Sequence, residues 1–118
     1  MAPTSLIGQK TTTSQAGRIE AIHGMPIRIS EIFSQIVKAA YVARVSVHNP
    51  KEVKKAKNAL LKAFTYQQKK LGFSIIEFIS TCPVNWGMTP MEALNWAQKD
   101  MVDYFPLGVF KDVGDENV

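Results

Sequence analysis

The segment that most constrains the fold is an apolar run at residues 73–79 that passes through a short loop into a marked helix start. Apart from Ser74 and Glu77 the run is apolar, as in a strand covered on both faces of a parallel sheet. The loop holds Cys82, and Thr-Pro-Met-Glu at residues 89–92 is typical of a capped helix N-terminus. Ligands of open α/β sheets bind beyond the carboxyl ends of the strands. The pattern predicts an α/β fold with Cys82 where functional sites gather.

A second strand precedes this segment and is joined to it by a helix. Residues 41–47 are β-rich, Asn49 and Pro50 are typical of a helix start, and Gly72 of a helix end. This order predicts a right-handed parallel crossover in which residues 41–47 and 73–79 are neighbours. Two strands are few for a free-standing parallel sheet. We therefore expect the chain to complete a larger sheet.

Two helices are expected to present apolar faces to this sheet. In the first, Ser30 is a candidate N-cap, and the expected face comprises Ile32, Phe33, Ile36, Val37 and Ala40. In the helix after Pro50, the expected face comprises Val53, Ala56, Leu60, Ala63, Phe64 and Leu71.

Length and composition indicate one compact domain. The chain has 118 residues, of which 46% are hydrophobic and 20% charged. Residues 1–24, here called the N-terminal segment, are rich in Thr, Ser, Gln and Gly and indicate an extended loop; residues 114–118 are expected to form a flexible tail. The sequence shows no transmembrane run or signal peptide, and one cysteine permits no internal disulfide. We expect a cytoplasmic protein with no membrane partner.

The net charge of +4 raises the question of a nucleic-acid partner. Five lysines fall on or near the helix after Pro50, opposite its apolar face: Lys51, Lys54, Lys55, Lys57 and Lys62. This pattern favours a solvated amphipathic helix over a phosphate-binding stripe, and no nucleic-acid motif accompanies it. A basic surface of this kind could also steer an acidic protein partner.

Two stretches carry a resemblance to a known family. They are Ser80-Thr81-Cys82-Pro83-Val84-Asn85-Trp86-Gly87 with Pro106–Lys111, and Met1–Ser5 with Gly8–Ser14. Together they resemble the C-terminal part of the thiamine-diphosphate-binding β subunit of 2-oxoacid:ferredoxin oxidoreductases, most closely the 2-oxoisovalerate (branched-chain) type. The match runs in order from Met1 to about Asp112, which makes residues 25–113 the C-terminal part of that family's cofactor-binding domain.

The resemblance implies a partial thiamine-diphosphate-binding fold with parallel strands and flanking helices. The family decarboxylates a 2-oxoacid oxidatively to acyl-CoA, using thiamine diphosphate, magnesium and iron-sulfur clusters, and passes electrons to ferredoxin. Its Gly-Asp-Gly cofactor motif and N-terminal cysteines correspond to positions before Met1. The expected partners are therefore the upstream half of the β subunit, the other oxidoreductase subunits and ferredoxin. Alone, the chain is expected to bind no cofactor, to be inactive and to self-associate.

Two site assignments follow from the resemblance. Cys82 corresponds to a candidate iron-sulfur ligand, the alternative being a buried, inert thiol. Met1, Ala2, Pro3 and Thr4 correspond to residues near thiamine diphosphate, the alternative being a polar terminus that is mobile in isolation. No catalytic residue is expected in this chain.

The rival functional class is non-enzymatic. A stand-alone remnant or interaction module would keep the fold without the cofactor motif. His23 and His48 have no nucleophile or acid motif beside them and are expected to be simple loop histidines. Trp86 and Trp96 are expected to be packing residues, and Trp86 could also shield a cluster from water.

Overall fold

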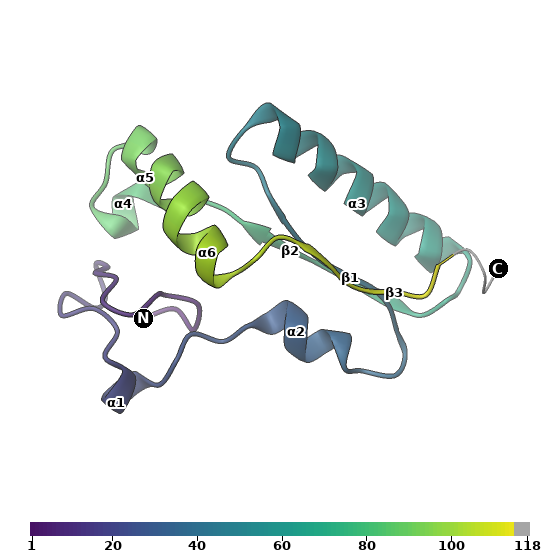
Figure 1. Cartoon of the computed structure of the whole chain (residues 1–118), viewed down its shortest axis with the longest axis horizontal. Helices are drawn as coiled ribbons and strands as arrows, with labels where there is room; N and C mark the ends of the chain where they lie inside the picture. The colour runs from purple at the N-terminus through teal and green to yellow at the C-terminus, as the bar shows by residue number, and fades with distance from the viewer. Residues whose placement is uncertain (115–118) are drawn as a thin grey trace. The chain divides into compact units, whose positions relative to one another are not determined.

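The computed structural model describes residues 1–114, so most of the expected tail lies outside the described part. The contacts divide the chain into two compact units, which Figure 1 shows with the element labels used below. The loop unit comprises Met1–Arg28 and Thr81–Tyr104, and the sheet unit comprises Ile29–Ser80 and Phe105–Val118. Each unit is described by itself.

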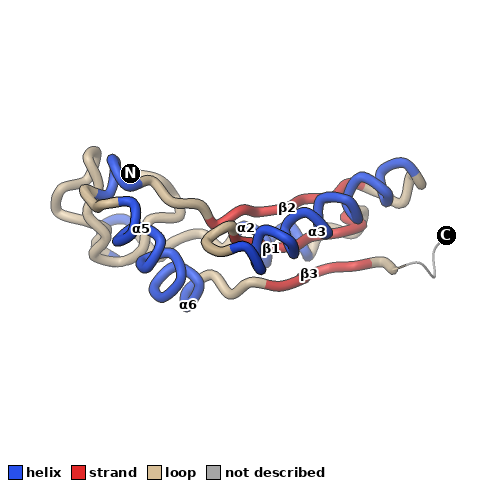
Figure 2. The backbone as a smooth tube through the Cα atoms, turned by 90° about the horizontal axis from the view of Figure 1, so that it is seen from above, coloured by secondary structure: helices blue, strands red, loops and turns tan. Residues whose placement is uncertain are grey.

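The sheet unit is built on three strands with β1 in the centre (Figure 2). Strand β1 (Ala39–Ser46) pairs in parallel with β2 (Phe73–Ile79), and on its other side in antiparallel with β3 (Gly108–Asp112). The predicted α/β fold and its parallel strand pair are confirmed. Strand β3 was not predicted, because its five residues are too few and too exposed to show a periodic pattern.

Helix α3 (Pro50–Gln68) begins as predicted. The Asn49 side chain accepts a hydrogen bond from the Glu52 amide at 2.9 Å, and Pro50 occupies the first turn. Gly72 lies beyond the helix end, and a Cβ there would stand 2.3 Å from the Lys38 carbonyl oxygen. Glycine is therefore required at this position by the close approach of the two chain segments as well as by its φ of 143°.

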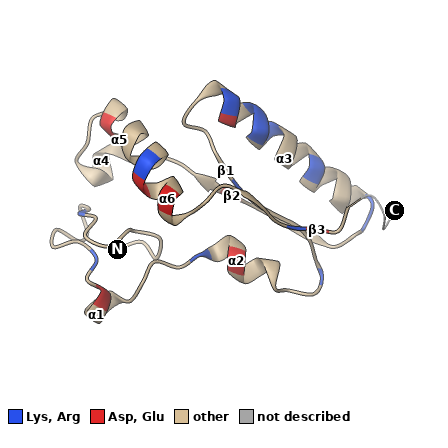
Figure 3. Cartoon of the chain, viewed as in Figure 1, with Lys and Arg blue, Asp and Glu red and all other residues tan. Residues whose placement is uncertain are grey.

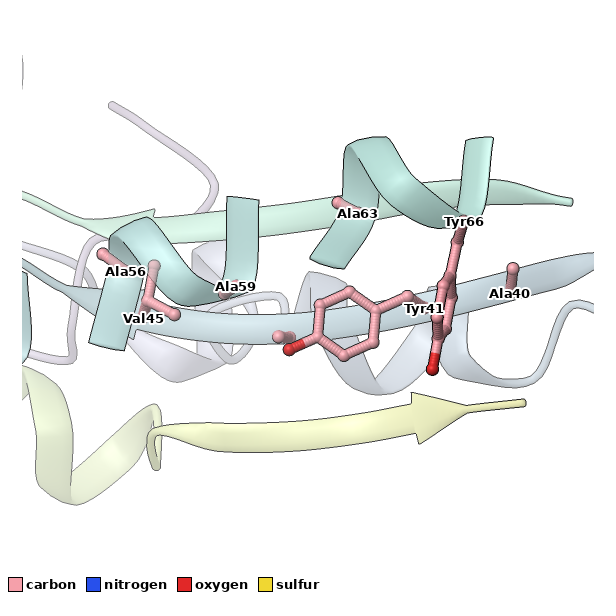
Figure 4. Close-up of a cluster of buried hydrophobic side chains, with 8 residues drawn as sticks. Ala40, Tyr41, Val45, Ala56, Ala59, Ala63 and Tyr66 are labelled. Carbon is pink, nitrogen blue, oxygen red and sulfur yellow. The ribbon is translucent and has the colours of Figure 1, made fainter. Parts of the chain in front are cut away.

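The α3 face that packs on β1 is built mainly of alanines (Figure 4). Ala56, Ala59 and Ala63 are buried, and the rings of Tyr41 and Tyr66 meet edge to face with centroids 5.9 Å apart. The predicted α3 face is only partly correct. Leu60 and Phe64, expected in the core, are 37% and 66% exposed. The reason is that α3 packs against β1 through its alanine side, which leaves these two residues outside the contact.

Helix α2 (Ile29–Ser34) covers the opposite face of the sheet. Ser30 is buried inside this helix and donates its hydroxyl to Glu77 Oε2 at 2.5 Å, so its assignment as N-cap was wrong.

The predicted apolar face of α2 was largely wrong. The helix ends at Ser34, so Ile36 and Val37 lie beyond it and Ala40 belongs to β1. Ile32, Ile36 and Val37 are exposed. The helix instead directs Ser30 and Glu31 to that face of the sheet, because they contact Glu77 and Arg44 there.

Arg44 is the polar centre of that face. Its side chain is fully buried, with Nε 2.9 Å from Glu77 Oε2 and Nη2 2.5 Å from Glu31 Oε2. Nη1 donates to the main-chain carbonyl of Pro106 at 3.0 Å. Burial lowers the pKa of Arg44, but the hydrogen bonds and charges of the two carboxylates outweigh it and raise that pKa above its usual value.

The loop unit contains only short helices. They are α1 (Glu20–His23), α4 (Pro83–Trp86), α5 (Pro90–Trp96), the π-helix η1 (Ala97–Met101) and α6 (Val102–Tyr104). The predicted capping box of α5 is present, with Thr89 accepting from the Glu92 amide and the Glu92 carboxylate accepting from the Thr89 amide. None of the described helices is both long and apolar enough to cross a membrane.

Candidate functional site

Arg18 organises the N-terminal segment. Its buried guanidinium donates to the carbonyl oxygens of Ser5 at 2.6 Å and Ala2 at 2.8 Å. It also donates to the carbonyls of His23 and Gly24 at 3.1 and 3.2 Å. All four acceptors are main-chain groups, and Arg18 forms no ion pair with a carboxylate among the described residues. One side chain thus binds the backbone at both ends of the N-terminal segment, which has little regular structure.

Thr12 and Asn85 join the N-terminal segment to the Cys82 loop (residues 80–87). The Thr12 amide donates to the Asn85 carbonyl at 3.0 Å, and the Thr12 hydroxyl donates to Asn85 Oδ1 at 2.5 Å. A cavity of about 260 Å³ lies between the two segments, lined by residues that include Lys10, Gln15 and Trp86. Residues 8–14 and 81–87, one part of each of the two stretches that carry the family resemblance, therefore meet within the loop unit.

Cys82 precedes helix α4 and is exposed. Its thiol caps no helix amide, and Pro83 follows it in the first turn of α4. The alternative of a buried, inert thiol does not hold, since the side chain is open to solvent. Exposure leaves the sulfur accessible to a metal or an oxidant, and the ligand role stays a prediction.

Within residues 1–4, the main-chain carbonyls of Ala2 and Pro3 accept hydrogen bonds. The Ala2 carbonyl accepts from Arg18, and the Pro3 carbonyl accepts from the Ile27 amide at 3.0 Å. Thr4 is half-buried, and the other three are exposed. In the described structure this end of the chain is thus tied to the loop unit.

The side chains of this chain do not by themselves fit the cofactors that the resemblance implies. No group of three or more His, Cys, Asp or Glu side chains within residues 1–114 could hold a metal ion. A cubane cluster needs four thiolates, and the sequence has one cysteine. The first nineteen residues contain no carboxylate to coordinate magnesium. Any such group would need ligands from another polypeptide segment.

The two histidines contact neighbouring backbone or hydroxyl groups, and the two tryptophans lie against other parts of the chain. His23 Nδ1 accepts from the Ile19 amide at 2.9 Å, and His48 Nδ1 lies 2.5 Å from the Ser46 hydroxyl. Trp86 lines the cavity beside Thr12. The indole Nε1 of Trp96 is buried with no hydrogen-bond partner among the described residues.

Charge on the sheet unit is concentrated on α3 (Figure 3). Lys55 pairs with Glu52 at 2.9 Å, and Lys62 pairs with Asp112 of β3. Asp112 also accepts from the Tyr66 hydroxyl at 2.6 Å. Burial tends to raise the pKa of Asp112, but the hydrogen bonds from Lys62, Tyr66 and the Gly114 amide lower it below its usual value.

Sequence reasoning missed Arg18 and Asn85. Asn85 was part of the matching stretch, but nothing in the sequence named Thr12 as its partner seventy-three residues away. Arg18 is the only arginine in a segment rich in small polar residues. A lone arginine in such a segment is a usable signal, because its five donors can satisfy the carbonyl groups of irregular backbone.

Three comparisons with known proteins bear on this site. No protein-family model matches the chain, and no solved structure matches it. Among curated proteins, the chain is 33% identical over 116 residues to ketoisovalerate oxidoreductase subunit VorA of Methanothermobacter marburgensis. That similarity covers 98% of this chain and 24% of the relative.

Two further relatives agree with this result. Ketoisovalerate oxidoreductase subunit VorA of Methanothermobacter thermautotrophicus is 30% identical over 112 residues, covering 95% of this chain and 24% of the relative. The 2-oxoglutarate synthase subunit KorB of Archaeoglobus fulgidus is 30% identical over 121 residues, which cover 94% of this chain and 41% of the relative. The chain spans about a quarter of the length of the VorA relatives. Nearly the whole chain is therefore similar to one part of these subunits, which belong to enzymes whose names refer to 2-oxoacids.

Proposed function

We propose that this chain works as part of a 2-oxoacid:ferredoxin oxidoreductase, in the β subunit that binds thiamine diphosphate. The assembled enzyme would oxidatively decarboxylate a 2-oxoacid, 2-oxoisovalerate in this proposal, to acyl-CoA and pass the electrons to ferredoxin. The observation that carries the proposal is similarity to VorA over 98% of the chain. The contact between Thr12 and Asn85 supports it, because it joins one part of each matching stretch, residues 8–14 and the Cys82 loop.

The distribution of apolar residues supports the need for a partner. Eight of the sixteen buried apolar residues in the described part are alanines. Large side chains such as Leu61, Phe64 and Val84 are instead 66% to 85% exposed. Exposed apolar surface of this kind marks interaction sites. We propose that the upstream half of the subunit and the other oxidoreductase subunits cover it.

In this proposal the chain contributes scaffold and one sulfur ligand. Arg18 shapes the backbone of Met1, Ala2, Pro3 and Thr4 near the cofactor, and Cys82 supplies one thiolate to an iron-sulfur cluster. The remaining ligands and the magnesium carboxylate would come from the upstream half of the β subunit, since residues 1–114 do not provide them. The proposed enzyme is cytoplasmic.

Reconstitution tests the proposal. The chain is co-expressed with the complementary portion of the Methanothermobacter marburgensis VorA subunit and the other subunits of that enzyme. We expect the chain to co-purify and to restore 2-oxoisovalerate-dependent reduction of ferredoxin. Omitting the chain is the control. Co-purification without activity would favour the non-catalytic interaction module, and a folded chain that does not associate would favour a stand-alone remnant.

The isolated chain provides a second test. Because the magnesium and cluster ligands are incomplete, calorimetric titration with thiamine diphosphate and magnesium should show no binding. Micromolar binding by this chain alone would contradict the proposal that the site also needs the upstream half of the β subunit.

A further inference from the structure

A cavity of about 370 Å³, here called the α3/β3 cavity, lies in the sheet unit between α3, β1 and β3. All of the residues that line it belong to the sheet unit. Its apolar lining comes from both strands and the helix and includes Ala43, Val45, Ala59, Leu107 and Val109. Ligand sites in proteins typically have volumes of about 300–1,000 Å³ and a mostly apolar lining. The size and lining of this cavity are therefore those of a small-molecule site.

Small residues on the three elements leave this space open. Ala43 of β1 and Ala59 of α3 line the cavity with single methyl groups, and Gly108 of β3 has no side chain. Both alanines are buried, and Figure 4 shows Ala59 in the layer between α3 and β1. Protein interiors are normally close-packed, with few voids larger than a water molecule. An open space of this size beside buried residues is thus available to a ligand.

The pairing of β1 with β3 also keeps a large ring out of the cavity. The register shifts between Val42 and Ala43, so that Val109 pairs with Ala43 and Phe110 is left outside the pairing. Paired residues of neighbouring strands share a face of the sheet, which places Val109 on the α3 side. The Phe110 ring instead lies by the guanidinium of Arg44, with its centroid 5.0 Å from Cζ. A regular register would pair Phe110 with Ala43 and turn the ring toward α3, where it would occupy the cavity.

A polar stripe of α3 borders the cavity. Lys55, Asn58 and Lys62 all line it, and their spacing of three and four residues places them on one side of the helix. The Asn58 side chain is exposed and makes no hydrogen bond to the described residues. Its amide NH2 can therefore donate to an anion. Such an anion would have an ammonium group one helical turn away on either side.

The ion pairs of the two lysines do not remove this preference for an anion. Lys55 pairs with Glu52 and Lys62 pairs with Asp112, but the two lysine side chains are 58% and 43% exposed. Exposed ion pairs are weak, so both lysines remain able to attract a ligand. Among the lining residues Glu52 is the only acid, and it precedes Asn58 by six positions, about 9 Å along the helix axis. An anion at Asn58 is thus closer along the helix to both lysines than to this carboxylate.

We propose that the α3/β3 cavity binds a small molecule that has an apolar body and one carboxylate. The body lies against Ala43, Ala59 and Val109, and it covers the Val109 side chain, which is 57% exposed without it. The carboxylate accepts a hydrogen bond from the Asn58 amide between Lys55 and Lys62. A cationic ligand with the same body is disfavoured, because the two ammonium groups repel it. This inference does not depend on the oxidoreductase proposal.

The test uses the full chain with two probes of opposite charge. 4-Phenylbutanoate carries the carboxylate, and 4-phenylbutylamine carries an ammonium group on the same body. In NMR titrations at constant salt, 4-phenylbutanoate should shift the methyl signals of Ala43, Ala59 and Val109. The dissociation constant should be about 1 mM or lower, as expected for a ligand of this size. The amine should bind at least about tenfold more weakly.

A pair of variants on α3 tests the position of the carboxylate. Asn58→Asp replaces the amide donor with a carboxylate of the same size, and we expect 4-phenylbutanoate to bind about tenfold more weakly. Gln67→Glu is the matched control, since it changes the net charge equally on the same helix. Gln67 is exposed and follows Asn58 by nine positions, about 180° around the helix. Its variant should bind like the wild type, and circular dichroism should show both variants folded.

Three results would overturn the inference. The first is unshifted methyl signals of Ala43, Ala59 and Val109 at a probe concentration tenfold above the expected dissociation constant. The second is equal binding of the amine and the carboxylate, which would remove the charge argument. The third is an equal loss of binding in Gln67→Glu and Asn58→Asp, which would assign the effect to net charge and not to this cavity.

Discussion

Arg44 and Glu77 lie opposite each other on the paired strands β1 and β2, with Nε and Oε2 2.9 Å apart. The arginine side chain is fully buried, and the glutamate is 14% exposed. Ser30 donates to the same carboxylate oxygen. The only acidic residue in β2 thus compensates a charge that the fold places at the centre of the sheet.

Replacing Glu77 should strongly destabilise the sheet unit. Glu77→Gln leaves Arg44 buried with Glu31 as its remaining carboxylate partner, and breaking a buried ion pair in this way costs roughly 3 kcal/mol. Denaturant unfolding measures the loss. Glu52→Gln, which removes only the surface pair with Lys55, should cost less than about 1 kcal/mol. Similar losses in the two variants would mean that the buried pair contributes no more than a surface pair.

Glu77 also shows what the sequence could and could not predict about the fold. The apolar run at residues 73–79 predicted a strand, and Asn49 with Pro50 predicted the start of α3, because both signals are local. The role of Glu77 depends on Arg44, thirty-three residues earlier, and a single sequence does not reveal such pairs. The rotation of α3 was mispredicted for a similar reason, since alanines and leucines satisfy the same helical spacing.

The stability of the sheet unit should depend on pH through Asp112. Its pKa is lowered in the folded chain, so the stabilisation is present above the usual carboxyl range of about pH 4 and is lost as pH falls through the folded pKa. Asp112→Asn should cost about 1 kcal/mol at pH 7, since Lys62 is partly exposed.

Unfolding free energies of wild type and Asp112→Asn, measured from pH 7 down to pH 2, check this. The difference between the two proteins should shrink toward zero at the acid end. A difference that stays constant over the whole range would show that the carboxylate charge is not involved.

Arg18 should control the order of the N-terminal segment. Arg18→Lys keeps the charge but cannot reproduce a planar fork that reaches four carbonyls, so two or more hydrogen bonds are lost. We expect a local loss of about 2–4 kcal/mol, seen as faster hydrogen exchange in residues 1–24. Lys10→Arg, an exposed change, is the control. Faster exchange throughout the sheet unit would contradict a local role.

Individual segments of the candidate site could be predicted from the sequence, but the contacts between them could not. Cys82 and the Thr-rich start were singled out by residue type and by the resemblance. Their meeting through Thr12 and Asn85, and the support from Arg18, are long-range or irregular contacts without periodicity. Loop conformation of this kind depends on individual hydrogen bonds, so a sequence pattern does not specify it.

The role of Cys82 as a cluster ligand is tested in the reconstituted enzyme. Cys82→Ser exchanges a thiolate for a hydroxyl, which is a poor ligand for an iron-sulfur cluster. Because Cys82 is exposed and caps no helix, the variant should fold normally. We expect the iron content to fall by about one cluster and ferredoxin reduction to fall with it. Thr81→Ser, a conservative change beside it, should alter neither. Wild-type iron content and wild-type ferredoxin reduction in Cys82→Ser would exclude the ligand role and leave Cys82 as an exposed loop residue.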